Sequence, residues 1–584
     1  MKSVPDRVVK TLEKKGLTGI AVTLEEESLC LKGMVKNHDD WLKAGYTAAA
    51  FPCREVINDL AIQGLEPEKD RLPALSDSLL EGRHFDAVVI GGGVIGCAAA
   101  RELTRWDISV ALLEKDGDVS CHASGRNDGM VHPGFAAHPG TKKATYNVRG
   151  NKLYTRVSED LGVPLVRCGS MLLLKNPLYI LLIPYFFLRA RQNGVEGCRF
   201  IERRKVFQLE KQVTRKQWGA FSFPTAGVMS PYRTAIAYAE NAVQNGAEVF
   251  LDTRVRGFRL EPSKPGKTRL TAVETNRGTF TASVVINAAG IWADRIAQYA
   301  GDRFFSLHYR KGVDCILDKK TGALQQRATG MPELFQLRAK TKGGGIVPTT
   351  EGNLLIGPTA EEIPYREEYS TSQTDIDALM SRLNLNRALK KEDIITYFAG
   401  VRACTWKEDF IIEPSRKVDN LIHAAGIQSP GFASAPAIAE DVAAFAVEAL
   451  KLQRTVMENR CFNPRREAPV NPRNLSPQER TKLIQSDPAY GRVICRCEGV
   501  SEGEVRDALR SSVPAMTLDG IKRRTRAGMG RCHGGFCTPR ILEIMSAELK
   551  EPMERLTKRG AGSLFFTGLT KETEPKKAVK GGEA

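Results

Sequence analysis

One stretch of the sequence decides the fold, FDAVVIGGGVIG at positions 85–96. Its apolar half, Phe85–Ile90, predicts a buried parallel strand, and the glycines that follow predict a tight turn into a helix over 97–105. A second predicted strand, Val110–Leu113, ends at Glu114. Strand, glycine turn, helix, strand and acid in this order predict a dinucleotide-binding βαβ unit.

The residues of this turn have defined roles in holding a dinucleotide. Gly91 permits the tight turn, Gly93 lets the backbone approach a pyrophosphate, and Gly96 lets the helix pack closely on the strand. The N-terminus of the helix stabilises the phosphate charge, and Glu114 is expected to accept hydrogen bonds from the ribose hydroxyls. The alternative is a glycine-rich turn in some other α/β sheet.

Three further motifs follow along the chain. They are SCHASGRNDGMVHPG at 120–134, VVINAAGIWAD at 284–294 and AGIQSPG at 425–431. With the glycine turn, they resemble in order the D-amino-acid-oxidase-like superfamily of FAD oxidoreductases, over residues 84–453. Within it, the chain is most similar to glycerol-3-phosphate dehydrogenases of the anaerobic type and to L-2-hydroxyglutarate dehydrogenases.

The resemblance implies FAD as cofactor and a fold of the α/β and α+β classes. It implies a Rossmann-like FAD domain beside a substrate domain built on an antiparallel sheet. The three glycines of the turn and Glu114 would hold the ADP half of FAD. The residues implied to approach the pyrophosphate and the flavin are Ser124, Gly125, Arg126, Gly290 and Gly431.

A flavin dehydrogenase of an alcohol must hold the anionic end of its substrate, accept the hydroxyl proton and place the C–H over flavin N5. Arg402 resembles the substrate-binding arginine of the superfamily and is therefore the expected anion clamp, a role that suits a guanidinium because it binds carboxylate or phosphate bidentately. The alternative for Arg402 is an ordinary ion pair. His132 is the expected catalytic base, because it matches the His of the family's Gly-x-x-His-x-Gly pattern and imidazole has a suitable pKa. The alternative is a hydrogen bond to the flavin or to the backbone. Ser429 could also face the substrate.

Two cations, Arg310 and Lys311, directly precede Gly312 and are expected to add positive charge to the pocket. Relatives usually continue as Gly-Glu-Tyr, whereas this chain reads Gly312-Val313-Asp314. The departure leaves the identity of the substrate open.

Four cysteines near the C-terminal end follow the pattern C-x-C, a gap of 34 residues, then C-x4-C. They are Cys495, Cys497, Cys532 and Cys537. Four thiolates can close a [2Fe–2S] cluster. Residues 491–550 resemble the bacterioferritin-associated-ferredoxin-like [2Fe–2S] domain, a small helical domain that ends many anaerobic-type glycerol-3-phosphate dehydrogenases. The alternative is a structural zinc site with the same four ligands.

The remaining segments are read from their composition. Residues 1–66 predict a small α/β module of α-β-β-α-β order that resembles the BON domain, with a structural or dimerising role favoured. Residues 67–83 and 454–490 read as connectors. Residues 571–584 are rich in Lys, Glu and Gly, which predicts a disordered tail.

The net charge and the hydropathy pattern limit which partners and which cellular location can be expected. The net charge of +17, without a nucleic-acid motif, favours an anionic substrate or an acidic redox partner. The first 15 residues lack the apolar core of a signal peptide, which predicts a cytoplasmic protein whose cysteines are thiols or metal ligands. The apolar run Leu178–Leu188 is too short to span a bilayer, which takes about 20 residues. It predicts a buried helix or a segment lying peripherally on the inner face of a membrane.

The sequence therefore predicts an FAD-dependent dehydrogenase of a small anionic alcohol. The domain order favours oxidation of sn-glycerol 3-phosphate to dihydroxyacetone phosphate, by hydride transfer to flavin and one-electron relay through a [2Fe–2S] cluster. Alternatives are an L-2-hydroxyglutarate-type 2-hydroxy-acid dehydrogenase and an amino-acid or amine dehydrogenase. A further alternative is that the C-terminal unit senses or delivers iron. The expected acceptor is a redox partner protein or a quinone-reducing subunit.

Overall fold

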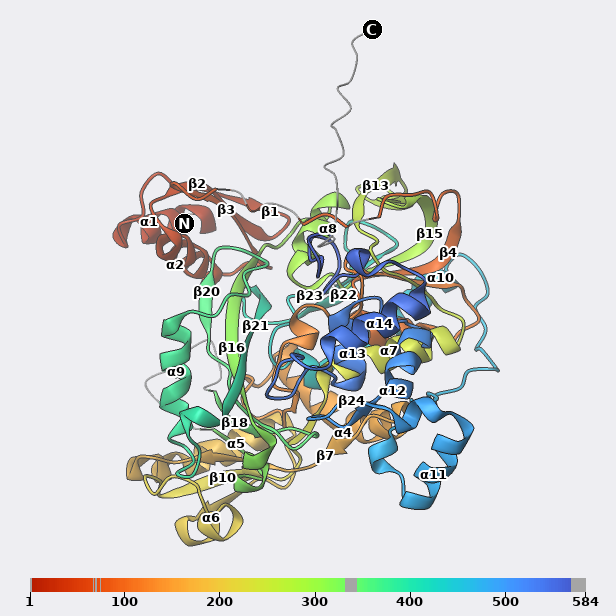
Figure 1. The fold of residues 1–584 in the computed structure, drawn as a ribbon. Coiled ribbons are helices and arrows are strands. Elements are labelled where there is room, and N and C mark those ends of the chain that lie inside the picture. The colour runs from red at the N-terminus through yellow and green to blue at the C-terminus, as the bar shows by residue number, and fades with distance from the viewer. Residues whose placement is uncertain (1–2, 67, 69–70, 74, 331–343, 569–584) are drawn as a thin grey trace. The chain divides into compact units, whose positions relative to one another are not determined.

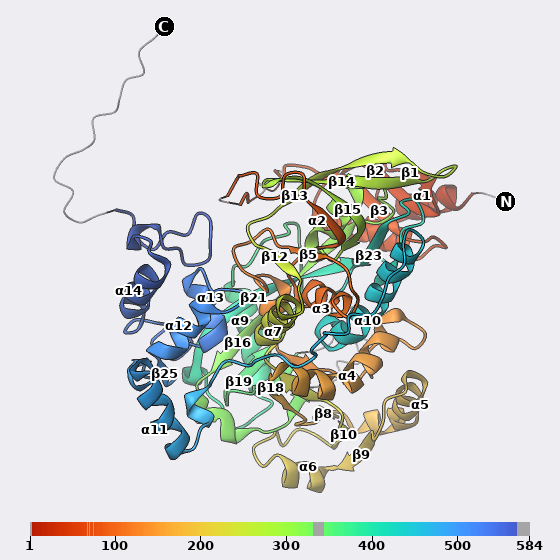
Figure 2. The same cartoon turned by 90° about the vertical axis from the view of Figure 1, so that its right-hand side faces the viewer.

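The computed structural model describes residues 3–66, 68, 71–73, 75–330 and 344–568 (Figures 1 and 2). The chain divides into two units, Met1–Ala468 and Pro469–Ala584. The tail predicted over 571–584 lies outside the described residues.

The first unit contains a largely parallel sheet, of eight strands among the described residues. Its parallel strands are β12 (Glu248–Phe250), β5 (Val110–Leu113), β4 (His84–Ile90), β15 (Gly278–Asn287) and β23 (Leu421–Ala425). Helix α3 (Val94–Leu103) follows β4 and packs against α7 (Pro231–Gln244) and α10 (Gly431–Lys451). The strand–turn–helix–strand order read at 85–114 is confirmed.

The packing of α3 depends on two glycines. A Cβ atom on Gly96 would lie 1.9 Å from the carbonyl oxygen of Gly91, so only glycine lets this helix approach the turn. Gly91 itself has φ +113°, a conformation that side chains with a Cβ rarely adopt. Without both glycines, the helix could not begin where the strand ends.

A second sheet, of nine strands among the described residues, forms the predicted antiparallel substrate side. Strands β16 (Leu307–Leu317) and β21 (Ile394–Thr405) pair antiparallel along almost their whole length. Their register sets Arg310 opposite Arg402 and Gly312 opposite Gly400. One pair in this sheet, β17 (Ala328–Gly330) with β8 (Ser170–Leu173), is parallel.

The N-terminal module has the expected order of elements. These are α1 (Val4–Lys14), β1 (Ala21–Glu25), β2 (Ser28–Val35), α2 (His38–Ala49) and β3 (Val56–Ile62). Its core includes Trp406, which comes from the main body and is 2% exposed. Gly45 of α2 makes room, since a Cβ there would lie 2.2 Å from the Trp406 ring. The module is thus packed onto the body through a shared core.

Both segments read as connectors contain ordered structure. The first packs on the body, with Leu80 fully buried. The second contains α11 (Pro477–Ser486), which begins at a capping box formed by Ser476 and Glu479. The S-x-x-E signature is present in the sequence, but the surrounding Pro and Arg residues led to the prediction of a connector.

The second unit is small and mainly helical. Helices α12 (Glu502–Arg510), α13 (Leu518–Thr525) and α14 (Thr538–Leu549) pack around Val505, Ile521 and Met545. Helices α12 and α13 lie between the two cysteine pairs, which agrees with the expected small helical domain.

The apolar run at 178–188 forms η2 (Pro177–Leu182) and α5 (Ile183–Asn193). Only one face of it is buried, so the expectation of a buried helix holds for half of its surface. In the described part of the chain, no helix is both long enough and apolar enough to cross a membrane.

Candidate functional site

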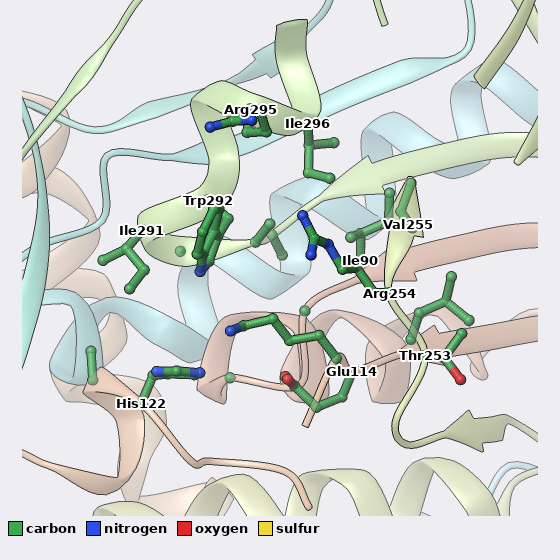
Figure 3. Close-up of a pocket in the computed structure, with 18 of the residues that line it drawn as sticks. Ile90, Glu114, His122, Thr253, Arg254, Val255, Ile291, Trp292, Arg295 and Ile296 are labelled. Carbon is green, nitrogen blue, oxygen red and sulfur yellow. The ribbon is translucent and has the colours of Figure 1, made fainter. Parts of the chain in front are cut away.

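A pocket opens where strands β4, β5 and β15 end (Figure 3). In nucleotide-binding sheets, the ligand commonly binds at the carboxyl ends of the parallel strands. Its empty volume, open mouth included, is about 920 Å³, a size that accommodates a large cofactor. Titratable side chains in its lining are Arg71, Glu114, Lys115, His122, Arg254, Arg295 and Tyr299.

Glu114 forms part of the pocket wall at the end of β5. Its carboxylate accepts the backbone N–H of Gly92 at 2.7 Å and that of Asp116 at 2.9 Å. Burial raises the pKa of Glu114, and the nearby Asp116 raises it further. The acid is thus held rigidly beside the glycine turn, where the ribose of a bound dinucleotide would lie.

The glycine turn leaves space where a phosphate would sit. Gly93 caps the N-terminus of α3, and a Cβ on it would meet only the Ser124 Oγ, at 3.1 Å. That same Oγ accepts the N–H of Val94 at 2.8 Å. Ser124 therefore lies at the helix N-terminus, as expected for a residue near the pyrophosphate. The residues present fit a dinucleotide.

The other residues expected near FAD lie on three separate elements. Ser124 and Gly125 belong to η1 (Ala123–Gly125), with Arg126 directly after it. Gly290 begins η3 (Gly290–Trp292) and lines the pocket. Gly431 begins α10, outside this pocket's lining.

Sequence reasoning missed the polar ring around the pocket mouth. His122 Nε2 lies 2.6 Å from Asp116 Oδ2, and Arg71 pairs with the same carboxylate. Lys115 pairs with Glu367. Arg71 comes from the segment read as a connector, so no local pattern marked it. His122 lies within the motif at 120–134, so the sequence offered a signal for it as a pocket residue.

The flavin-side loop meets the substrate sheet at Arg126. A Cβ on Gly400 of β21 would lie 2.2 Å from the carbonyl oxygen of Arg126. The Arg126 guanidinium lies over the ring of Tyr369, 4.4 Å from its centroid, and donates to the carbonyl of Cys121 at 2.9 Å. The loop and the sheet are therefore in direct contact on this face of β21.

Arg402 lies on the same face of β21, two residues beyond Gly400. A Cβ on Gly312 would lie 2.5 Å from Arg402 Nη2, so the glycine makes room for the guanidinium. Both terminal nitrogens lie 3.4 Å from the carbonyl oxygen of Thr359. Burial lowers the pKa of Arg402, while Asp314 opposes that shift. Among the described residues, no carboxylate forms a salt bridge with it.

Asp314 is an unexpected neighbour of this arginine. It is 1% exposed, and its Oδ1 has no hydrogen-bond partner among the described residues. Burial raises the pKa of Asp314 well above its ordinary range; Asp128 raises it further, and Arg402 opposes the shift. A carboxylic acid of this kind can be neutral and can donate a hydrogen bond. The departure from Gly-Glu-Tyr at Val313 and Asp314 was the only signal for it.

Arg310 and Lys311 do not add uncompensated charge to the pocket, contrary to expectation. Arg310 is 2% exposed and pairs with Glu362 and Glu408 at 2.7 and 2.6 Å. Lys311 pairs with Glu361 at 3.1 Å. Neighbouring carboxylates balance both cations, so Arg402 is the cation best placed for a substrate anion.

His132 directly follows strand β6 (Met130–Val131). Its carbonyl oxygen accepts the side-chain amides of Asn147 and Asn151 at 2.8 and 2.9 Å, which fixes the backbone at this position. The side chain is partly buried. The role of His132 as a base stays a prediction.

The cysteines of the second unit converge. Cys497 Sγ lies 3.8 Å from the Sγ atoms of both Cys495 and Cys532, and the Cys537 thiol interacts with that of Cys495. Two thiolates on one tetrahedral metal, each bonded at about 2.3 Å, would lie about 3.8 Å apart. A Cβ on Gly530 would lie 2.4 Å from Cys497 Sγ, so the glycine clears the cysteine. The four thiols therefore fit a [2Fe–2S] cluster, although no three His, Cys, Asp or Glu side chains in the described ranges already surround a single ion position.

Comparison with known proteins identifies two domains in the chain. A family model described as FAD dependent oxidoreductase matches residues 86–445, and one described as BFD-like [2Fe-2S] binding domain matches residues 493–547. The chain is 36% identical to a glycerol 3-phosphate dehydrogenase of Caloramator mitchellensis, over 83% of this chain and 99% of that protein. It is 26% identical to a human mitochondrial L-2-hydroxyglutarate dehydrogenase, over 50% of this chain and 65% of that one.

A solved structure supports the same fold. L-alpha-glycerophosphate oxidase from Mycoplasma pneumoniae, with FAD bound, superposes with a TM-score of 0.60 at 24% identity, covering 67% of this chain and 100% of the other. The first family model alone spans more than half of the 584 residues. The chain therefore belongs to the FAD-dependent oxidoreductases, and it carries a BFD-like domain for a [2Fe–2S] cluster.

Proposed function

We propose that the protein is a dehydrogenase that oxidises sn-glycerol 3-phosphate to dihydroxyacetone phosphate. The observation that carries this proposal is the Arg402 guanidinium, which lies over Gly312 on the sheet face that meets the Arg126 loop. A cation that forms no salt bridge within the described ranges, beside a cofactor loop, suits an anionic substrate. The alignment with a glycerol 3-phosphate dehydrogenase over 83% of this chain supports the phosphate ester.

The residues around Arg402 suggest how an alcohol phosphate would be held. Arg402 would bind the phosphate oxygens bidentately. Asp314, whose pKa is raised by burial, would hydrogen-bond a hydroxyl or a phosphate oxygen nearby. His132 would accept the proton of the hydroxyl that is oxidised, on a ring nitrogen. When bound, FAD supplies the acceptor for a hydride, and the [2Fe–2S] cluster supplies an acceptor for single electrons.

For the cofactor residues we propose the roles expected from the sequence. Gly91, Gly93, Gly96 and Glu114 would hold the ADP half of FAD. Those proposed for the pyrophosphate and the flavin are Ser124, Gly125, Arg126, Gly290 and Gly431. The proposed cluster ligands are Cys495, Cys497, Cys532 and Cys537. The domain limits proposed here remain 1–66, 84–453 and 491–550.

The second candidate is an L-2-hydroxyglutarate-type dehydrogenase. A carboxylate would fit the Arg402 guanidinium as a phosphate does. The likeness to the human L-2-hydroxyglutarate dehydrogenase supports it, over a smaller share of the chain. An amino-acid or amine dehydrogenase is the third candidate.

An anaerobic substrate screen separates these candidates. The holoenzyme is mixed in turn with sn-glycerol 3-phosphate, L-2-hydroxyglutarate, glycine and L-proline, and the loss of flavin absorbance is followed. Of the four compounds, we expect only sn-glycerol 3-phosphate to bleach the flavin rapidly. In His132→Ala, the rate of flavin reduction by this compound should fall by about 100-fold or more. Bleaching by another compound alone would replace the proposed substrate, and an unchanged rate in His132→Ala would remove this residue as the base.

The cluster suggests the kind of redox partner. A one-electron carrier suits a redox partner protein or a quinone-reducing subunit. We place the protein in the cytoplasm, peripherally on the inner face of the membrane, where such a subunit would be found.

A further inference from the structure

One helical segment of the first unit is apolar on two opposite faces. The segment comprises η2 (Pro177–Leu182) and α5 (Ile183–Asn193). Its inward face carries Tyr179, Leu182 and Phe186, which join a core cluster with Phe221 of β10 (Gly219–Phe223). This face holds the segment on the body and explains its helical form.

The opposite face is apolar but exposed. It consists of four side chains spaced three, four and three residues apart, as on one side of a helix. They are Leu178, Leu181, Tyr185 and Leu188, which are 65%, 75%, 44% and 54% exposed. We call these four residues the outer apolar face. Single exposed apolar residues are common, but a continuous stripe along one helix face marks an interaction site.

Cationic side chains flank the outer apolar face at both ends. Lys175 lies three residues before Leu178, and Arg191 lies three residues after Leu188; both are exposed. The Arg189 guanidinium donates to the Tyr185 hydroxyl at 3.1 Å, which places a further charge at the rim. An apolar stripe between long cationic side chains is the pattern of a helix that lies in a membrane interface.

The surrounding lobe is strongly basic. Residues 175–218 contain ten Lys or Arg and three Glu. Glu210 is buried and accepts the backbone N–H of Gln326, and Glu196 pairs with Lys152. Both views show α5 beside β10 in this lobe, at the end of the first unit away from the N-terminal module (Figures 1 and 2). Positive charge around an apolar face is complementary to anionic lipid headgroups.

We propose that the outer apolar face docks the protein on a membrane surface that contains anionic lipids. The segment of 17 residues would lie in the plane of the interface, because a span takes about 20 apolar residues and its inner face is already packed on the body. Two exposed leucines, Leu181 of η2 and Leu188 of α5, would enter the boundary between headgroups and acyl chains. The basic side chains would contact the headgroups.

Vesicle flotation of the full-length holoenzyme tests this directly. Vesicles of phosphatidylcholine alone are compared with vesicles of equal parts phosphatidylcholine and phosphatidylglycerol. We expect binding at least about ten-fold tighter to the anionic vesicles, weakened by salt near 0.5 M. The variant Leu181→Ser with Leu188→Ser should lower binding by about ten-fold or more while keeping its FAD content.

A matched control uses exposed apolar residues outside the lobe. Met34→Ser with Leu452→Ser removes side chains that are 62% and 87% exposed, and binding should not change. Absence of wild-type binding to anionic vesicles, or equal losses in both double variants, would overturn the proposal. A dimer that becomes a monomer in Leu181→Ser/Leu188→Ser, with vesicle binding unchanged, would also overturn it and assign the face to a second copy of the chain. None of these results depends on the substrate, so the proposed function is tested separately.

Discussion

The hydroxyl of Tyr46, in the N-terminal module, accepts a hydrogen bond from Arg310 Nη2 of the substrate sheet at 3.0 Å. Glu408 Oε1 lies 3.2 Å from the same hydroxyl, and Glu408 Oε2 accepts the side-chain amide of Gln428 at 2.7 Å. Gln428 directly precedes the turn that leads into Gly431. One chain of hydrogen bonds therefore connects the module to the turn expected beside the flavin.

Tyr46→Phe should reduce the free energy of unfolding of the holoenzyme by about 1–3 kcal/mol. The variant keeps the ring but leaves buried Arg310 and its carboxylate partners without the bridging hydroxyl. Urea unfolding measures the change. Lys417→Ala is the control, because it removes an exposed ion pair with Glu26 and should cost about 0–1 kcal/mol. Equal losses in the two variants would show that the Tyr46 hydroxyl adds no specific stability.

Gly93→Ala should weaken FAD binding without unfolding the apoprotein. Its Cβ would meet only Ser124 Oγ, at 3.1 Å, but it would occupy space needed by the pyrophosphate. Gly96→Ala should also destabilise the apoprotein, because its Cβ would lie 1.9 Å from the Gly91 carbonyl oxygen. FAD titration and thermal unfolding of both apoproteins check this. If Gly93→Ala binds FAD as the wild type does, the pyrophosphate does not lie at this turn.

Arg402→Ala should raise the KM for the anionic substrate by about 100-fold or more, because a charged hydrogen-bond donor to the anion is lost. Steady-state kinetics with an artificial acceptor measure this change. The FAD content should stay at the wild-type level, and Arg402→Lys should restore part of the affinity through its point charge. Loss of FAD from Arg402→Ala would mean that the arginine supports the fold instead of binding substrate.

Glu55 should make stability depend on pH. It is 5% exposed where the module meets the body, and burial raises the pKa of Glu55 to about 8. Because this value exceeds the unfolded pKa of about 4.3, the stability present below the unfolded value is lost as the pH rises towards 8. The free energy of unfolding of Glu55→Gln, relative to the wild type, should therefore rise by about 4 kcal/mol between pH 5 and pH 8.5. Urea unfolding at the two pH values measures the gain. If the difference in unfolding free energy between Glu55→Gln and the wild type were the same at pH 5 and pH 8.5, Glu55 would already be ionised in the folded protein at pH 5.

The parts of the fold that follow local rules could be predicted from the sequence. The turn at 91–96 is fixed by the stereochemistry of glycine between an apolar strand and a helix, and the structure has the turn at these residues. The cysteine spacing likewise predicted four thiols that the structure brings together. Both features depend on residues close in sequence or on a fixed ligand count.

Features that depend on long-range pairing could not be predicted. Arg71 reaches the cofactor pocket from a segment that reads as a linker. The room that Gly312 leaves for Arg402 depends on the register of two strands that are about 90 residues apart in sequence. Arg310 looked like a pocket cation because its carboxylate partners lie on other segments. The sequence carries no local pattern for any of these contacts.

The central claim is that electrons from a small anionic alcohol reach both FAD and the cluster held by Cys495, Cys497, Cys532 and Cys537. The most direct measurement adds sn-glycerol 3-phosphate to the anaerobic holoenzyme and records flavin absorbance and electron paramagnetic resonance on the same sample. We predict loss of the flavin absorbance together with the signal of a reduced [2Fe–2S] cluster. Bleached flavin beside a cluster that stays oxidised, with no signal at any substrate concentration, would contradict it.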